Sequence, residues 1–259
     1  MQNTSFDLII IGAGPGGYVG AIRAAQLGMN VACIERRATL GGTCLNVGCI
    51  PSKALLNASE HFANAASGSL RNMGVSVGKV RLDLDQMMQS KSNIVSTLTG
   101  GIDFLFKKNR ITRLEGTASI IAPGKIKIAT GKDKGDYQAE KIMIATGSHP
   151  SSLPGITIDE SRIVSSTGAL SFETVPKKLL VIGAGYIGLE LGTVWARLGA
   201  EVEVIEYLPR ILPGMDSEVA KKFMAIAQKQ GLKFRLNTAV KSAKPNKNGV
   251  TLTVIPAEG

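Results

Sequence analysis

Aromatic residues are scarce in this sequence, at 5% of its 259 residues. A protein that binds single-stranded nucleic acid needs aromatic side chains on which bases stack, so the composition argues against that class. Cysteine is also rare, and three residues are too few for the disulfide framework of a small secreted protein. The first five residues contain no basic side chain, so they lack the charged start of an export signal. We therefore expect a cytoplasmic protein.

The sequence also lacks an apolar run long enough to span a membrane. The longest candidate, from Leu179 to Ala196, is interrupted by Glu190 and by several glycines. Lys and Arg outnumber Asp and Glu by 30 to 20, but these basic residues are dispersed along the chain. We interpret them as a solvated basic surface, with a nucleic-acid patch as the alternative. Neither a membrane nor a nucleic acid is expected as a partner.

Glycine, by contrast, is abundant, and it marks an internal repeat. Residues 8–35 and 179–206 share one pattern at a constant offset of 171 positions. Each copy has a short apolar strand, a GxGxxG motif, a helix of small residues, and a second strand ending in glutamate. This order is the fingerprint of a Rossmann-like dinucleotide-binding unit. The sequence therefore predicts an α/β fold with two such units and two bound dinucleotides.

Each residue type in the repeat has a physical role. The first glycine of a motif permits a tight turn, the second lets helix N–H groups reach a pyrophosphate, and the third allows close helix packing. Glu35 and Glu206 are expected to accept hydrogen bonds from ribose hydroxyls. The motif glycines are Gly12, Gly14 and Gly17 in the first copy and Gly183, Gly185 and Gly188 in the second.

The 140 or so residues between the copies exceed a single crossover connection. Helices are expected over residues 53–66 and 86–109, the second interrupted at Gly100-Gly101, followed from Gly116 by an antiparallel β-meander. We expect each domain to combine a parallel sheet with such a meander. A linker after Gly147 places the domain boundary between residues 1–149 and 150–259.

Cys44 and Cys49 stand just before an expected helix start, with Gly48 between them. They could close a small disulfide, and the helix N-terminus would stabilise a thiolate formed on its reduction. In an intracellular protein such a bridge is more often catalytic than structural. A zinc site is the alternative, but three Cys and two His at unsuitable spacings argue against a metal. Cys33, inside an apolar strand, is interpreted as a buried small residue.

The stretch from Gly41 to Lys53, GGTCLNVGCIPSK, resembles the active-site signature of the flavoprotein disulfide reductases. Its sequence is most similar to that of the dihydrolipoamide dehydrogenases, the E3 components of 2-oxo-acid dehydrogenase complexes. Both glycine motifs and the run from Ala145 to Ser148 follow in the family's order, so the resemblance covers the whole chain. It implies oxidation of dihydrolipoamide by NAD+ through FAD and a Cys44–Cys49 redox disulfide. A reductase of the mercuric or glutathione type, or a non-catalytic dinucleotide-binding fragment, remains an alternative.

The resemblance also implies roles for individual residues. Cys49 would lie nearest the flavin, Cys44 would exchange with dihydrolipoamide, and Tyr186 would cover the nicotinamide pocket. Lys53 and Glu190 would form an ion pair beside flavin N5, where a fixed cation stabilises arriving electron density. Without the motif, these side chains would be ordinary surface or packing residues. The implied FAD positions are Gly12, Gly14, Gly17, Glu35, Gly42, Thr43, Lys53, Gly116, Thr146, Gly147 and Ser148; the implied NAD positions are Gly183, Gly185, Tyr186, Gly188, Glu190, Glu206 and Val240.

Members of this family continue into a C-terminal interface domain that supplies a histidine–glutamate base across a homodimer. His61 and His149 match neither the motif nor its context, so the base is expected beyond residue 259. We therefore expect residues 1–149 to form the FAD domain with the redox disulfide, and residues 150–259 a truncated NAD domain. By itself this portion is expected to be inactive; the whole protein is expected to be a homodimer acting on dihydrolipoamide or a lipoyl domain.

Overall fold

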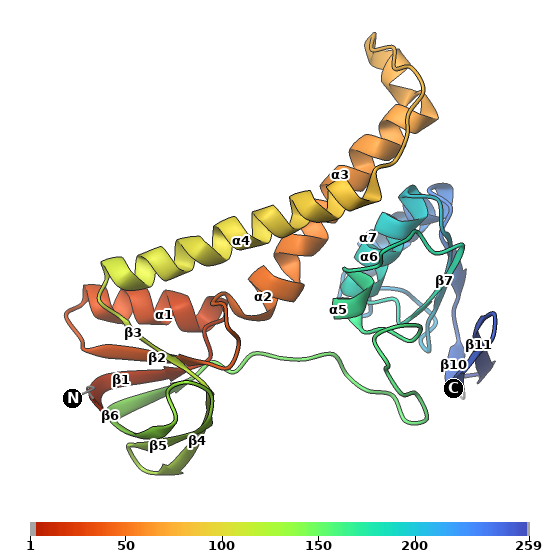
Figure 1. Cartoon of the computed structure of the whole chain (residues 1–259). Helices are drawn as coiled ribbons and strands as arrows, with labels where there is room; N and C mark the ends of the chain where they lie inside the picture. Colours follow the sequence, from red (N-terminus) through yellow and green to blue (C-terminus); the bar gives the residue numbers. More distant parts are fainter. Residues whose placement is uncertain (1–3, 258–259) are drawn as a thin grey trace. The chain divides into compact units, whose positions relative to one another are not determined.

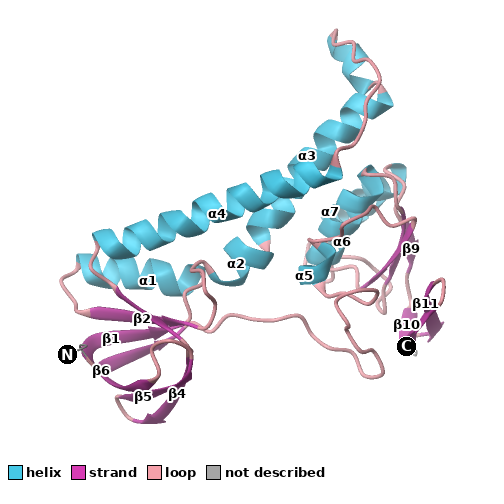
Figure 2. Ribbon diagram, viewed as in Figure 1, coloured by secondary structure: helices cyan, strands magenta, loops and turns pink. Residues whose placement is uncertain are grey.

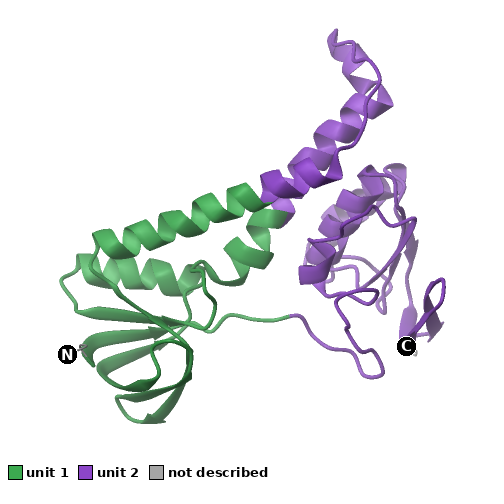
Figure 3. Ribbon diagram, in the orientation of Figure 1, with its two compact units in different colours: residues 1–51, 92–149 green, residues 52–91, 150–259 purple. Residues whose placement is uncertain are grey.

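The computed structural model describes residues 4–257, which divide into two compact units (Figure 3). The first unit comprises residues up to 51 together with 92–149, and the second comprises 52–91 together with the residues from 150 onward. The division after residue 149 falls in the expected linker. Residues 52–91, expected within the first domain, group instead with the second unit. The assignment of one unit to FAD and the other to NAD stays a prediction.

The first unit is built on one mixed sheet (Figure 1). Its strand order is β3-β2-β1-β6-β5-β4; the first four strands are mutually parallel, and β5 pairs antiparallel with both β6 and β4. The predicted meander is thus present and continues the parallel sheet. The strands are β1 (Ser5–Ile11), β2 (Val31–Glu35), β3 (Thr112–Glu115), β4 (Thr117–Ala122), β5 (Lys125–Thr130) and β6 (Gly135–Ile144).

Both faces of this sheet are covered, which explains why β1 is apolar at consecutive positions. On one face Ile10 packs in a cluster with α1 (Pro15–Gln26) and with Phe106 near the end of α4 (Leu84–Lys108). On the other face Ile9 packs with Ile126 and Ile128 of β5. The short helix α2 (Gly42–Val47) follows β2.

The second unit contains a parallel sheet in the order β7-β8-β9 and a separate β10–β11 hairpin. Its antiparallel part is therefore a single hairpin rather than a longer meander. Trp195 is fully buried in this unit; its Nε1 donates to the carbonyl of Ala169 at 2.9 Å, and its ring lies 5.0 Å from that of Phe172. The elements are β7 (Lys178–Ile182), β8 (Glu201–Ile205), β9 (Lys233–Arg235), β10 (Thr238–Asn246), β11 (Gly249–Pro256), α5 (Ser166–Ala169), α6 (Tyr186–Arg197) and α7 (Ser217–Lys229).

Two long helices, α3 and α4, connect α2 to β3 along the chain (Figure 2). Helix α3 (Cys49–Ser67) leads through a 3-10 turn (Ser69–Met73) toward α4, and Leu55 of α3 is fully buried in the core of the second unit. The expected interruption of α4 at Gly100-Gly101 is wrong, because the helix continues through both glycines. Burial of Thr99, Ile102 and Phe106 on its packed side offsets the low helix propensity of glycine. No helix within residues 4–257 has both the length and the apolar character that a membrane span requires.

Candidate dinucleotide and redox sites

The two glycine motifs fold alike. Helix α1 begins at Pro15 after Gly14, and α6 begins at Tyr186 after Gly185, which preserves the offset of 171 positions. Both helices start earlier than the apolar pattern indicates, directly at the motif. The unpaired N–H groups of each first helical turn therefore adjoin the glycine loop, where the helix dipole favours an anion.

The glutamate of each copy fixes its own glycine loop. Glu35 is buried, and its carboxylate accepts hydrogen bonds from the N–H groups of Ala13 at 2.9 Å and Arg37 at 3.0 Å. Glu206 is also buried and accepts equivalent bonds from the N–H groups of Ala184 at 2.6 Å and Leu208 at 2.9 Å. Each carboxylate oxygen keeps a lone pair. The geometry is therefore compatible with the predicted contacts to ribose.

The segment that carries Cys44 is fastened to the first glycine loop. The N–H of Gly41 donates to the carbonyl of Ala13 at 2.8 Å. Gly42 adopts a left-handed φ of +58°, and a Cβ on it would lie only 2.5 Å from the Cα of Gly14. Only glycine permits this approach of the two backbones without displacement.

One further segment closes around the same loop, and another contacts Glu35. A Cβ on Gly12 would lie 3.1 Å from the Cα of Thr146, and the hydroxyl of Thr43 donates to the carbonyl of Ser148 at 3.4 Å. The N–H of Gly116 donates to the backbone carbonyl of Glu35 at 2.9 Å. The predicted FAD positions gathered in the first unit are Gly12, Gly14, Gly17, Glu35, Gly42, Thr43, Gly116, Thr146, Gly147 and Ser148.

Space for phosphate groups is present at both helix starts. Within residues 4–257, a Cβ built on Gly16 of the first motif, or on Gly183 or Gly185 of the second, would meet no atom within 4 Å other than the adjoining backbone. The third glycines have a different role, because a Cβ on Gly17 or Gly188 would collide with the carbonyl of the first glycine of its motif. The residues present thus fit two dinucleotides, because each glycine motif leaves open positions at a helix N-terminus, where backbone N–H groups bind phosphate.

The two cysteines flank a backward turn. Cys44 lies in α2 and is half-buried, whereas Cys49 is exposed at the first position of α3. A Cβ on Gly48 would lie 3.3 Å from the Cα of Cys44, so the glycine allows the chain to fold back on that residue. A disulfide between the two cysteines stays a prediction. In the described residues, no group of three or more His, Cys, Asp or Glu side chains is arranged to hold a metal ion.

The third cysteine belongs to the core. Cys33 is completely buried in β2, and burial raises the pKa of its thiol to about 12. A thiol that stays protonated at neutral pH is a poor nucleophile, which agrees with its interpretation as a small packing residue.

The second unit contains the expected ion pair. The Nζ of Lys53 lies 2.6 and 2.8 Å from the two carboxylate oxygens of Glu190, and the hydroxyl of Ser52 lies 3.4 Å from one of them. The Lys53 side chain is 57% exposed and that of Glu190 28%. An ion pair this exposed contributes little to stability, so its value lies in where it holds the ammonium group. Its place beside a flavin stays a prediction.

Two more predicted NAD positions stand apart from these contacts. Tyr186 is the first residue of α6 and is 68% exposed, and Val240 lies in β10 beside an irregularity of the hairpin. Their roles stay predictions. Sequence reasoning missed Arg197, whose Nη1 donates to the carbonyl of Leu56 in α3 at 3.2 Å. The one sequence signal that could have found Arg197 is its difference from Gln26, the residue at the equivalent position of the first copy.

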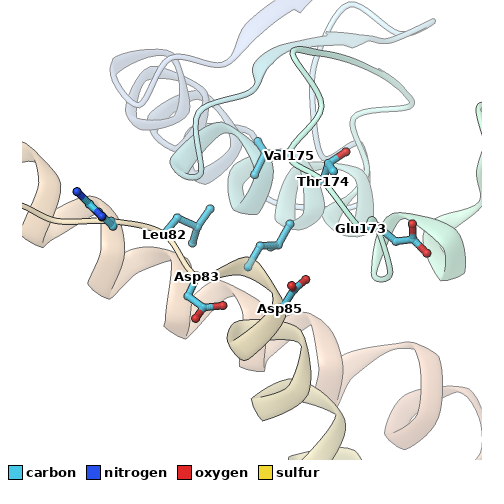
Figure 4. A pocket seen from close by; sticks show the side chains of 8 residues that line it. Leu82, Asp83, Asp85, Glu173, Thr174 and Val175 are labelled. Atoms are coloured by element: carbon cyan, nitrogen blue, oxygen red, sulfur yellow. The ribbon is translucent and has the colours of Figure 1, made fainter.

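An open depression of about 600 Å³ in the second unit contains none of these residues (Figure 4). It is lined by residues 81–85 and 173–175, among them the carboxylates of Asp83, Asp85 and Glu173. Asp83 also accepts a hydrogen bond from the N–H of Gln86 at the start of α4, at 2.9 Å. Three carboxylates against one arginine repel phosphate, so this depression is no dinucleotide site.

Known proteins resemble the whole chain. It is 54% identical over 255 residues to dihydrolipoyl dehydrogenase 1, mitochondrial, of Arabidopsis thaliana, covering 98% of this chain and 50% of that one. It is 52% identical over 257 residues to dihydrolipoyl dehydrogenase 3 of Pseudomonas aeruginosa, covering 98% and 55%. Among solved structures, a Cu(II) complex of a mutant of RclA, the HOCl-induced flavoprotein disulfide reductase from Escherichia coli, has a TM-score of 0.80 at 27% identity. That match covers 98% of this chain and 54% of RclA.

Two points follow from these relatives. The chain spans about half the length of the curated relatives it matches. The expectation of a cytoplasmic location is wrong, because relatives from Arabidopsis thaliana, Pisum sativum and Schizosaccharomyces pombe are named mitochondrial. The sequence pattern of the pyridine nucleotide-disulphide oxidoreductases matches residues 6–259. On this match and on the duplicated glycine loops, the chain belongs to the pyridine nucleotide-disulphide oxidoreductase family.

Proposed function

We propose that the chain is the dinucleotide-binding portion of an enzyme that oxidises dihydrolipoamide with NAD+, giving lipoamide and NADH. Membership of the family implies the use of FAD and NAD(P). The observation that carries the proposal is the cysteine-bearing segment fastened to the first glycine loop through Gly41 and Gly42. This contact supports a redox-active pair beside a bound dinucleotide.

Thiol–disulfide exchange is the step that this chain's own side chains would perform. A thiolate of dihydrolipoamide attacks Cys44 of the Cys44–Cys49 disulfide, and closure of the lipoamide disulfide leaves both cysteines reduced. The Cys49 thiolate benefits from its place at the start of α3. Bound FAD would carry the two electrons from this dithiol to NAD+. A base must take the substrate's thiol proton, and neither His61 nor His149 is assigned to that role.

Lys53 and Glu190 would supply fixed charge for that electron transfer. Glu190 holds the ammonium group with two short bonds, so the charge is already oriented before reaction. The preference for NAD over NADP is attributed to Glu206, whose buried carboxylate would repel a 2′-phosphate. Arg210, the nearest following cation, donates instead to the carbonyl of Pro213 at 2.5 Å.

The proposed partners are the lipoyl domain of a 2-oxo-acid dehydrogenase complex and, for the whole enzyme, a second copy in a homodimer. Both proposals are supported by the dihydrolipoyl dehydrogenase relatives. Neither of these two proposed partners depends on where the first compact unit ends and the second begins.

The test uses a chimera in which residues 1–259 replace the matching part of the Pseudomonas aeruginosa relative. We expect tightly bound flavin and NAD+ reduction with dihydrolipoamide, with negligible turnover on glutathione disulfide or Hg(II). A chimera that binds flavin but prefers glutathione disulfide would assign the chain to another branch of the family. One that binds no flavin, although the unmodified relative does, would refute the proposal.

A further inference from the structure

Helix α3 is held on α6 at two points of the second unit. Glu190 binds the side chain of Lys53, and two helical turns later Arg197 donates to the carbonyl of Leu56. Leu56 follows Lys53 by three residues, so both contacts hold the same stretch of α3. Between them Leu55 is fully buried.

The contact of Arg197 is chemically specific. Arg197 is half-buried, and within the described residues no carboxylate lies at ion-pair distance from its guanidinium. The charge is directed instead at a backbone carbonyl, which also accepts a bond from the hydroxyl of the buried Ser59 at 3.0 Å. Charge-assisted bonds are the stronger class, so this one is suited to fixing the backbone of α3. A cation at the end of α6 also suits the helix dipole, but the dipole alone does not direct it at Leu56.

The first copy of the repeat serves as an internal control. Its backbone hydrogen bonds match those of the second copy, yet positions equivalent to Glu190 and Arg197 hold Val19 and Gln26. Val19 is 55% exposed. The Rossmann-like unit therefore does not itself require an acid and a base at these two positions. They occur in the copy against which Leu55 and Leu56 of α3 pack.

We infer that Arg197 is a positioning residue that sets Lys53 against Glu190 by fixing the backbone of α3. The catalytic meaning of this placement rests on the proposed function, whereas the placement itself does not. Without the bond to Leu56, the first turns of α3 are free to shift along α6. The ammonium group then loses part of its contact with Glu190.

The test measures how fast an acetylating reagent modifies the Lys53 amine in the cofactor-free chain. Peptide mass spectrometry gives that rate relative to the exposed Lys127. An ammonium that donates to two carboxylate oxygens is protected, so Arg197→Met should raise the relative rate about threefold or more. This rate should approach that of Glu190→Gln, and Arg197→Lys, which keeps a charged donor, should restore most of the protection.

Lys91→Met is the matched control, because Lys91 of α4 makes another bond to the rest of the second unit, to the carbonyl of Leu170 at 2.7 Å. It should leave the modification of Lys53 unchanged. Equal rates in the parent and Arg197→Met, or an equal rise in Lys91→Met, would overturn the inference. If Arg197→Met does not fold, Arg197→Gln, which introduces the residue of the first repeat, gives the same comparison. Because no cofactor is present, failure of flavin binding cannot produce either result.

Discussion

Replacement of Gly42 by alanine tests whether the cysteine-bearing segment and the first glycine loop form one dinucleotide site. The added Cβ would lie 2.5 Å from the Cα of Gly14. Nonbonded carbon atoms settle at about 3.5–4.0 Å, so the two backbones must separate by roughly 1 Å or more. Hydrogen bonds from the loop to a pyrophosphate tolerate only a few tenths of an ångström.

The expected loss follows from one such bond. A hydrogen bond to a charged group contributes about 1.5–3 kcal/mol, so its loss should raise the Kd for FAD about 10- to 100-fold. The left-handed φ of +58° adds about 1–2 kcal/mol of destabilisation to the folded chain. Flavin fluorescence quenching measures the first effect, and chemical denaturation without cofactor measures the second.

Gly28→Ala separates these two effects. Gly28 also has a left-handed φ, of +91°, but a Cβ on it would meet no atom of the described residues within 4 Å apart from its chain neighbours. It should lower the free energy of unfolding by a similar 1–2 kcal/mol without changing the Kd for FAD. A folded Gly42→Ala variant that binds FAD within threefold of the parent would refute the close-approach argument.

Three further outcomes are expected. Glu206→Gln should reduce the preference for NADH over NADPH about tenfold or more in kcat/KM, because it removes the charge that opposes the 2′-phosphate; an unchanged ratio would contradict this. In the chimera, Cys49→Ser should abolish the long-wavelength absorbance of the two-electron-reduced enzyme, whereas Cys44→Ser should retain it; identical spectra would contradict the assigned roles. Burial raises the pKa of Cys33 to about 12 from 9.0, so the protonated thiol's contribution to stability is complete below pH 9 and is lost as pH rises toward 12. Denaturation of Cys33→Ala should therefore show a weaker loss of stability than the parent over that interval.

The duplicated motif could be located from the sequence because its signals are local. Glycine spacing, strand length and the terminal Glu35 and Glu206 together predicted two loops, whose hydrogen bonds match position for position. The ion pair between Lys53 and Glu190 could be predicted only from family resemblance, since 137 positions separate its members. No local pattern relates their side chains.

Other features depend on long-range packing and escaped prediction. The Gly100-Gly101 pair has poor helix propensity, and its place within α4 became clear only from the buried residues around it. Arg197 was missed because its acceptor is a backbone carbonyl, which every residue possesses. The grouping of residues 52–91 with the second unit also depends on long-range packing, so the order of the motifs along the sequence could not predict it.

The position of Trp195 makes the second unit optically distinct. It is the only tryptophan in the sequence, and it lies completely buried against Phe172 within that unit. Its emission therefore reports the unfolding of the second unit alone, while far-ultraviolet circular dichroism reports both. If the two signals change at different denaturant concentrations, the units unfold separately, and each can be assigned its own free energy.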